Sequence, residues 1–160
     1  MPILRRAALL LPVLLLALAA APAAAQSADS ALVAEARAFM DAYGSDLRTA
    51  DREAIGARYD RRGIQFMFNG VGQAVSWDSV AAQYRSRWQP PAAFEWRDLV
   101  YVPAGPDAVV VNGNFLWTVT AGEEPLRFRY TALLVRQDRA LRIRLEDESM
   151  MAGPTPVAPN

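Results

Sequence analysis

The feature that most constrains the fold is the stretch from residue 107 to residue 150, where apolar and polar side chains alternate. It contains three long segments, residues 108–120 (AVVVNGNFLWTVT), 126–136 (LRFRYTALLVR) and 141–150 (LRIRLEDESM). β-Branched and aromatic residues at alternate positions are typical of half-buried strands. The short breaks between the segments suit hairpin connections. We therefore predict three long antiparallel strands, with the preceding part of the chain covering one face of their sheet.

The start of the chain has the pattern of a secretory signal peptide. Arg5 and Arg6 precede an apolar run at residues 7–21, and three alanines end at Ala25. A basic start, a short apolar run and small residues form a cleavage signal, and the run is shorter than the roughly 20 residues of a membrane-spanning helix. We predict a signal peptide at 1–25, one domain at 26–150 and a disordered Pro-rich tail at 151–160. The location is then periplasmic or secreted.

Composition excludes several kinds of function. The chain has 17 basic and 17 acidic residues, and loss of Arg5 and Arg6 with the leader leaves a small acidic excess. That balance argues against a nucleic-acid partner. The chain has no Cys and no His, so it lacks a disulfide, a thiol nucleophile, the commonest general base and the commonest zinc ligand. We predict no cofactor and no metal, and no membrane partner after cleavage.

Upstream of the three strands, helical patterns come first. Ser27 or Asp29 can cap a first helix, and Asp51 can cap a short second one that ends at Tyr59. The first helix has apolar residues at steps of three and four: Leu32, Ala36, Phe39, Met40, Tyr43 and Leu47.

Between these helices and the three long strands, the sequence predicts a strand, a third helix and another strand. Residues 63–69 (GIQFMFN) form a short strand that Gly70-Val71-Gly72 breaks. A third helix follows from Ser76 to Trp88, and residues 94–102 (FEWRDLVYV) form another strand. This order predicts the α+β class, with helices on one face of an antiparallel sheet.

Hairpin pairing indicates which side chains face the helices. Pairing Arg136 with Leu141 places Tyr130 opposite Asp147 on an apolar face. The reverse face then pairs Thr131 with Glu146 and Arg129 with Glu148. In the preceding hairpin, pairing Thr120 with Pro125 adds further apolar pairs to the inward face: Trp117 with Phe128, Phe115 with Tyr130, and Val111 with Leu134.

Asp147 is the one carboxylate that this register turns toward the helices. Desolvation among aromatic rings would raise its pKa and make it a candidate for proton transfer. A structural role, as a hydrogen-bond partner of Tyr130 or an Arg, is the alternative. The strand at 94–102 allows two registers, one with Leu99 and Tyr101 inward and one with Trp96, Asp98 and Val100 inward. The second would let Asp98 approach Asp147.

The element order resembles the nuclear transport factor 2-like superfamily, in its SnoaL-like branch, which is close to the association domain of calcium/calmodulin-dependent kinase. The similarity covers residues 31–150. It rests on a helix pair, the segment YDRRGIQFMFNG, the helix at 76–88 and long strands ending in RALRIRLEDES. The resemblance implies a cone-shaped, cystatin-like α+β fold in which a bent antiparallel sheet wraps the helices and encloses a pocket. Members include ketosteroid isomerase, scytalone dehydratase and polyketide cyclases, and also non-catalytic binding and oligomerisation domains.

The resemblance implies little for single residues. Many exported relatives have an HxHxS-like stretch in the last strand, where this chain has Leu145 and Asp147 before Ser149. The missing His residues leave an isomerase-like option, with Asp147 as the base and Tyr130 as the hydroxyl donor.

We rank three functions. The first is an exported domain that binds a small apolar molecule, with ligand-binding candidates Tyr59, Phe66, Phe68, Tyr84, Trp88, Phe115, Trp117 and Phe128. The second is an assembly domain, a homodimer through the outer sheet face around Leu116, Leu133 and Val135. The third is an isomerase- or dehydratase-type enzyme with Asp147 as acid or base. Glu146, Asp147 and Glu148 alternate faces on a strand, so they do not converge on a metal ion.

Overall fold

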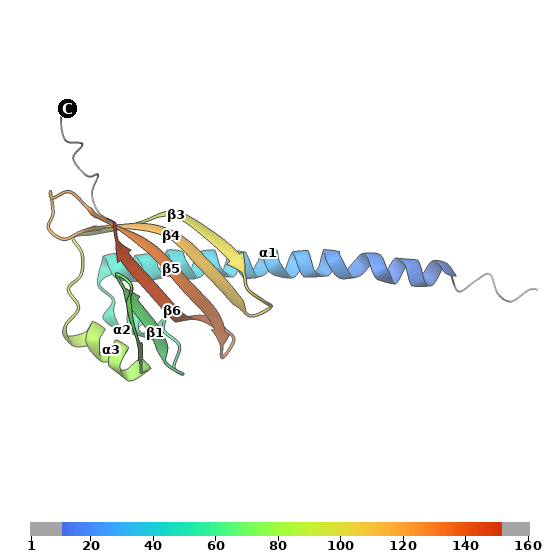
Figure 1. Cartoon of the computed structure of the whole chain (residues 1–160), viewed down its shortest axis with the longest axis horizontal. Coiled ribbons are helices and arrows are strands. Elements are labelled where there is room, and N and C mark those ends of the chain that lie inside the picture. The colour runs from blue at the N-terminus through green and yellow to red at the C-terminus, as the bar shows by residue number, and fades with distance from the viewer. Residues whose placement is uncertain (1–10, 152–160) are drawn as a thin grey trace, which may run out of the picture.

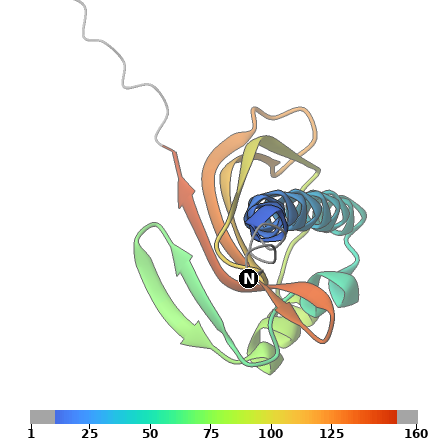
Figure 2. The ribbon, with the colours of Figure 1, turned by 90° about the vertical axis from the view of Figure 1, so that its right-hand side faces the viewer.

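The computed structural model describes residues 11–151, so residues 1–10 of the predicted signal peptide and residues 152–160 of the predicted tail lie outside the description. A six-stranded bent sheet curls around the second half of one long helix (Figures 1 and 2). The helices are α1 (Leu11–Thr49), α2 (Arg52–Ala57) and α3 (Trp77–Ser86). The strands are β1 (Ile64–Phe68), β2 (Val71–Val75), β3 (Ala93–Pro103), β4 (Ala108–Thr118), β5 (Leu126–Gln137) and β6 (Ala140–Met150).

The sheet order is β2-β1-β6-β5-β4-β3, which confirms the predicted α+β class. The prediction of a wholly antiparallel sheet is wrong at one pair, because β1 runs parallel to β6. A hairpin fixes the direction of sequential strands, whereas β1 and β6 are far apart in the sequence and no turn constrains them.

The β1–β2 hairpin corrects a second expectation. Residues 71–75 were not predicted as a strand, because Gly70-Val71-Gly72 was interpreted as a break. Four of the five residues are exposed. The turn at Asn69 and Gly70 has φ of 50° and 80°. Asn-Gly with two positive φ values is the two-residue turn that suits a hairpin, so the signal was present in the sequence.

The helix caps were predicted correctly where the chain turns sharply. Asp51 accepts a hydrogen bond from the Ala54 N–H at 2.9 Å, and Ser76 accepts one from the Ser79 N–H at 3.2 Å. The predicted cap at Ser27 or Asp29 is wrong, because α1 is already helical from Leu11. The Ala- and Leu-rich segment before Ser27 favours a helical conformation.

The predicted apolar stripe of α1 is buried against the sheet, from Leu32 to Leu47. Gly44 lies in this stripe, and a Cβ there would be 2.8 Å from Trp96 Nε1. The Trp96 indole N–H donates to the Met40 carbonyl at 3.0 Å. Gly44 therefore allows β3 to approach α1 closely.

The register of β5 and β6 starts as predicted and then departs. Arg136 pairs with Leu141 and Leu134 with Ile143, but an irregularity between Leu133 and Leu134 shifts the rest of the ladder by one residue. Tyr130 therefore lies opposite Glu148, and Thr131 opposite Asp147. The extra residue is Arg144, whose guanidinium donates to the Gly63 carbonyl.

The shift occurs where the partner of β6 changes. Ile143 exchanges backbone hydrogen bonds with residues 58 and 60, each 2.9 Å long, whereas Leu145 pairs with Gln65 of β1. β-Bulges are typical of such changes in pairing. The bulge turns Glu146 and Glu148 toward the helices and Asp147 away, the reverse of the predicted charge ladder.

The other two predicted registers also need correction. Between β4 and β5, Phe115 pairs with Phe128 and Trp117 with Leu126, a shift of two residues that leaves the same faces inward. β3 has a bulge between Arg97 and Val100. Both of its alternative inward sets are therefore partly right: Trp96 before the bulge and Leu99 and Tyr101 after it pack on the core, while Asp98 is exposed.

Candidate functional site

An aromatic cavity of about 260 Å³ lies between the end of α1, α3, β1 and the inner face of the sheet. We call this cavity the chamber. Its walls are mainly aromatic, and seven of the eight predicted ligand-binding residues line it; ligand binding itself stays a prediction. The lining residues are Tyr43, Leu47, Phe66, Phe68, Gln83, Tyr84, Trp88, Phe94, Trp96, Phe115, Trp117, Leu126, Phe128 and Glu148.

The chamber walls are held in place by contacts between rings. Phe115 and Phe128 stack with centroids 4.7 Å apart, and Trp88 meets Trp117 edge to face at 6.2 Å. Arg52 anchors the end of α3, because its Nη1 donates to the carbonyls of Tyr84 and Trp88, each at 2.6 Å. The chamber is therefore bounded by a packed aromatic wall and by a helix end that α2 holds.

Glu148 is the one carboxylate in the chamber lining. Burial, and to a smaller extent the nearby charges of Glu146 and Asp147, together raise the pKa of its carboxyl group to about 8. No hydrogen bond within residues 11–151 compensates for this burial. A carboxyl group with this pKa is largely protonated at neutral pH and faces the chamber as a hydrogen-bond donor.

Glu146 lies deeper and is fully buried. Three tyrosine hydroxyls donate to it: Tyr59 at 2.6 Å to Oε2, Tyr130 at 2.9 Å to Oε1 and Tyr43 at 3.3 Å to Oε1. Burial raises the pKa of Glu146, while the hydroxyl donors counteract this by stabilising the anion.

The two carboxyl groups therefore differ in their hydrogen-bond partners. Glu146 has three donors and Glu148 has none within the described residues, so the negative charge of the pair resides on Glu146. That charge in turn favours the protonated form of Glu148. Pairs of carboxyl groups whose surroundings separate their protonation states are typical of sites that hold or transfer protons.

Tyr84 extends the hydroxyl network into the chamber. Its hydroxyl lies 2.8 Å from that of Tyr59, which bonds to Glu146, and its ring belongs to the chamber lining. Burial raises the pKa of Tyr84, as does the charge of Glu146, so its phenol stays protonated. Since Tyr59 donates its proton to Glu146, Tyr84 donates its own to Tyr59, so a ligand in the chamber meets one free donor, the carboxylic acid of Glu148.

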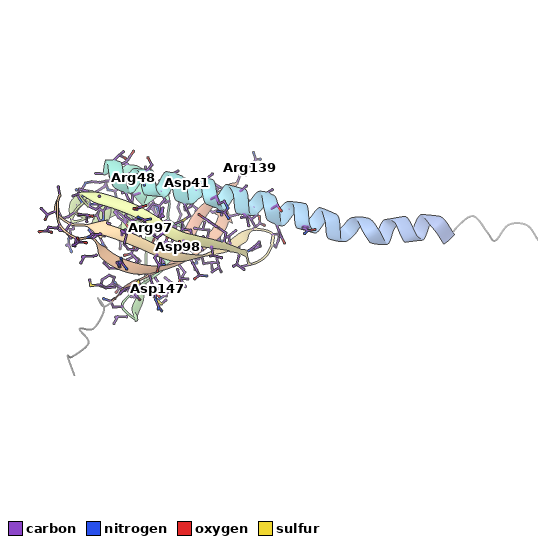
Figure 3. All side chains as sticks on the ribbon, turned by 90° about the horizontal axis from the view of Figure 1, so that it is seen from above. Asp41, Arg48, Arg97, Asp98, Arg139 and Asp147 are labelled. Carbon is purple, nitrogen blue, oxygen red and sulfur yellow. The ribbon has the colours of Figure 1, made fainter. Side chains whose placement is uncertain are left out.

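The structure places the two predicted catalytic residues elsewhere. Asp147 alternates with Glu146 and Glu148, so its side chain lies on the outer face of the sheet (Figure 3), where its Oδ1 is shielded from solvent and has no hydrogen-bond partner among the described residues. Tyr130 is buried and donates to Glu146, but it does not line the chamber. Tyr59, a predicted ligand-binding residue, likewise lies behind the wall and holds Glu146.

Sequence reasoning missed Glu146 and Glu148 because regular alternation excluded them from the inner face. The signal that could have found them is the run of polar residues after Ile143, in which a one-residue shift exchanges the faces of all that follow. Nothing in the local sequence marks the position of the bulge.

Metal-ligand groups and membrane-spanning helices are both absent from the described residues. In residues 11–151, no group of three His, Cys, Asp or Glu side chains is placed to hold a metal ion. Across the same residues, no helix is both long and apolar enough to span a membrane.

Comparison with known proteins identifies the fold. No protein-family model matches the chain, and no curated protein matches it. A nuclear transport factor 2-like protein of unknown function from Pseudomonas putida KT2440 has a TM-score of 0.65 and 19% identity, over 75% of this chain and 87% of that chain. A cystatin-like fold protein from Burkholderia xenovorans LB400 has a TM-score of 0.63 and 22% identity, over 76% and 93% of the two chains.

A provisionally named ketosteroid isomerase from Parabacteroides distasonis has a TM-score of 0.58 and 14% identity, over 71% of this chain and 83% of that chain. The chain therefore has the cystatin-like fold of the nuclear transport factor 2-like superfamily, as its sequence predicted. At these identities the similarity establishes the fold and no activity.

Proposed function

We propose that this chain binds a small, largely apolar molecule in the chamber and holds one acceptor atom of that molecule with Glu148. The observation that carries the proposal is the Glu148 carboxyl group in a largely aromatic lining, where it has no hydrogen-bond partner among residues 11–151 and burial raises its pKa to about 8. Such a donor gives an apolar pocket its orientation and specificity.

The volume of the chamber suggests the size of the ligand. An apolar cavity of about 150 Å³ accommodates benzene, and the chamber has about 260 Å³. A ligand of two fused rings with a carbonyl oxygen matches this space. The carbonyl oxygen would accept a hydrogen bond from Glu148.

Calorimetric titration with 2-naphthamide tests this proposal, because the probe combines two fused rings with one carbonyl group. We expect binding by the wild-type protein and about fivefold or greater weakening in Glu148→Leu, since a hydrogen bond contributes about 1 kcal/mol or more. Asp147→Leu is the matched control on the other face of the same strand and should retain binding. Absence of binding, or equal losses in both variants, would contradict the proposal.

A second candidate is an isomerase- or dehydratase-type enzyme. The pKa of about 8 at Glu148 supports it, because a group that titrates near the working pH transfers protons efficiently. The acid and base roles predicted for Asp147 and Tyr130 would fall to Glu148 and Tyr84. Glu148 would remove a proton next to a carbonyl group, and the Tyr84 phenol would stabilise the enolate oxygen once its proton turned from Tyr59 to the ligand.

Proton exchange provides a test of catalysis that needs no natural substrate. The C2 protons of 1-tetralone exchange with solvent deuterium when a base removes them. If the chain is an enzyme of this type, exchange followed by proton NMR is faster with the wild-type protein than with Glu148→Gln, and it accelerates as the pH rises through about 8. Equal exchange rates with and without protein would contradict the enzyme proposal and would not affect the binding proposal.

We also propose export and self-association, which follow from the sequence patterns. Among the α1 side chains that the structure describes, the first in the core is Leu32, so cleavage after Ala25 is compatible with an intact domain. The outer sheet face exposes Val100 and Val102, at 58% and 49%, beside partly buried Leu116 and Leu133. A dimer through this face would cover them, and light scattering at several concentrations tests for it.

A further inference from the structure

Gln83 of α3 lies where three hollows meet. It lines the chamber, a small hollow of about 50 Å³ and an outer groove of about 630 Å³. The small hollow, which we call the neck, shares Phe66 and Tyr84 with the chamber and shares Gln73 and Ser79 with the groove. The neck therefore lies between the inner chamber and a surface groove that runs between β2 and α3.

The groove differs from the chamber in its chemistry. Its lining includes Gln73 and Gln83, the hydroxyls of Ser79 and Ser86, and the guanidinium of Arg87. Across residues 11–151, the side chains of Gln73, Gln83 and Arg87 form no hydrogen bond or ion pair with other protein groups. These amides and this cation are available to a ligand.

The chamber also has an apolar rim. Phe68 and Leu126 line the chamber there and are 41% and 39% exposed. A polar arm that left the chamber past these side chains would gain no hydrogen bond from them, because neither has a polar group. The neck offers the same arm amide partners, so the polar part of a long ligand is more stable between β2 and α3.

The neck also limits the shape of that arm. Its volume of about 50 Å³ has room for only a few water molecules. A linear chain of amide or ether units fits this space and a ring does not. A ring system is accommodated in the chamber on one side, and a polar or charged end in the groove on the other.

We propose that the ligand is an elongated amphiphile with a ring system in the chamber, a narrow arm of hydrogen-bonding groups beside Gln83 and Gln73, and an anionic end at Arg87. This inference rests on the proposed binding function and specifies its ligand class. Arg87 follows directly after α3 and lines the groove. Its exposed charge attracts an anion without a buried ion pair, so the gain in affinity is sensitive to salt.

Two probes with the same ring system test the inference by calorimetric titration. The short probe is 2-naphthamide, and the long probe is N-(2-naphthoyl)glycylglycine, which adds two amide-linked units and a carboxylate. We expect the long probe to bind at least about tenfold more tightly, because it gains hydrogen bonds and one charge interaction. That advantage should decrease at high salt.

Variants identify the path of the arm. Arg87→Gln and Gln73→Leu should each reduce the advantage of the long probe and leave the short probe unchanged, because neither residue lines the chamber. Arg85→Gln is the matched control, since Arg85 lies in the last turn of α3, two residues before Arg87 and outside the groove, and pairs with Glu53 at 3.5 Å. Leu126→Gln at the apolar rim should affect both probes alike and leave their ratio unchanged.

The outcomes separate this inference from the function on which it rests. If 2-naphthamide binds and the long probe binds no more tightly, the groove is not part of the site and the inference is overturned, while the binding function stands. If Arg85→Gln reduces the advantage as much as Arg87→Gln, the gain is general charge attraction and the inference is again overturned. If neither probe binds, both proposals fail.

Discussion

The hydroxyl of Tyr130 donates to Oε1 of Glu146 at 2.9 Å, although Tyr130 lies opposite Glu148 in the β5–β6 ladder. The diagonal contact supplies a donor to the deeper carboxylate and leaves the nearer one free. The difference in partners between Glu146 and Glu148 arises from this arrangement. It gives the chamber one available acid above a buried, fully bonded anion.

Removing a donor from Glu146 should destabilise the fold. We expect Tyr59→Phe to lower the free energy of unfolding by about 1.5–3 kcal/mol, because it deletes a 2.6 Å hydrogen bond to a buried charged group. Tyr43→Phe deletes a longer bond of 3.3 Å and should have a smaller effect. Urea unfolding of both variants checks the order, and a larger loss in Tyr43→Phe would show that Glu146 is held differently.

The pH dependence of stability should report Glu148. Its pKa of about 8 in the folded state exceeds the ordinary value of 4.5, so between these pH values the folded state binds a proton that the unfolded state has lost. The stabilising contribution is complete below about pH 4.5 and is lost as the pH rises through about 8. The size is on the order of a few kcal/mol, since one pKa unit corresponds to about 1.4 kcal/mol.

Urea unfolding of the wild type and Glu148→Gln from pH 5 to pH 9 measures this contribution. Gln cannot ionise, so the variant should show a flatter profile and exceed the wild type in relative stability at the alkaline end. Parallel profiles for the two proteins would mean that Glu148 titrates normally in the folded state.

Asp147 should behave as a liability for stability. Its Oδ1 is shielded from solvent without a partner among the described residues, and an unsatisfied buried polar atom costs about 1–3 kcal/mol. We expect Asp147→Val to raise the free energy of unfolding by about 1 kcal/mol, helped by the preference of Val for strands. Thermal unfolding measures the change, and a clear loss of stability would reveal a partner for Asp147.

Gly44 should resist substitution where Gly56 does not. A Cβ at Gly44 would lie 2.8 Å from Trp96 Nε1, whereas at Gly56 its nearest neighbours would be 3.4 Å away. We expect Gly44→Ala to cost about 1–3 kcal/mol through displacement of a packed side chain. Gly56→Ala should be close to neutral, because the gain in helix propensity offsets the tight contact. Equal effects in chemical denaturation would contradict the close approach of β3 to α1.

The sequence sufficed for the fold because local signals were strong. Asp51 and Ser76 cap their helices as predicted, the stripe from Leu32 to Leu47 is buried, and the four long strands lie within a few residues of their expected bounds. Capping and periodicity act over a few residues, so a single sequence contains them.

The functional site was harder to predict from the sequence, because it depends on pairing between segments that are far apart in the chain. Arg144 bulges where β6 changes its partner from residues 58–60 to β1, and that pairing brings together segments about 80 residues apart. The aromatic wall was predicted from composition and periodicity, whereas the identity of the inward carboxylate depended on one extra residue in one strand. Because of that extra residue, the carboxylate that faces the chamber is Glu148 and not Asp147.

The most direct test of the account is the titration of Glu148 in the folded protein, followed by ¹³C NMR of glutamate-labelled samples. The account requires one side-chain carboxyl resonance that titrates near pH 8 in the wild type and is missing in Glu148→Gln. If the Glu148 resonance instead titrates close to 4.5, the carboxyl group is solvated, and the chamber has no protonated donor at neutral pH.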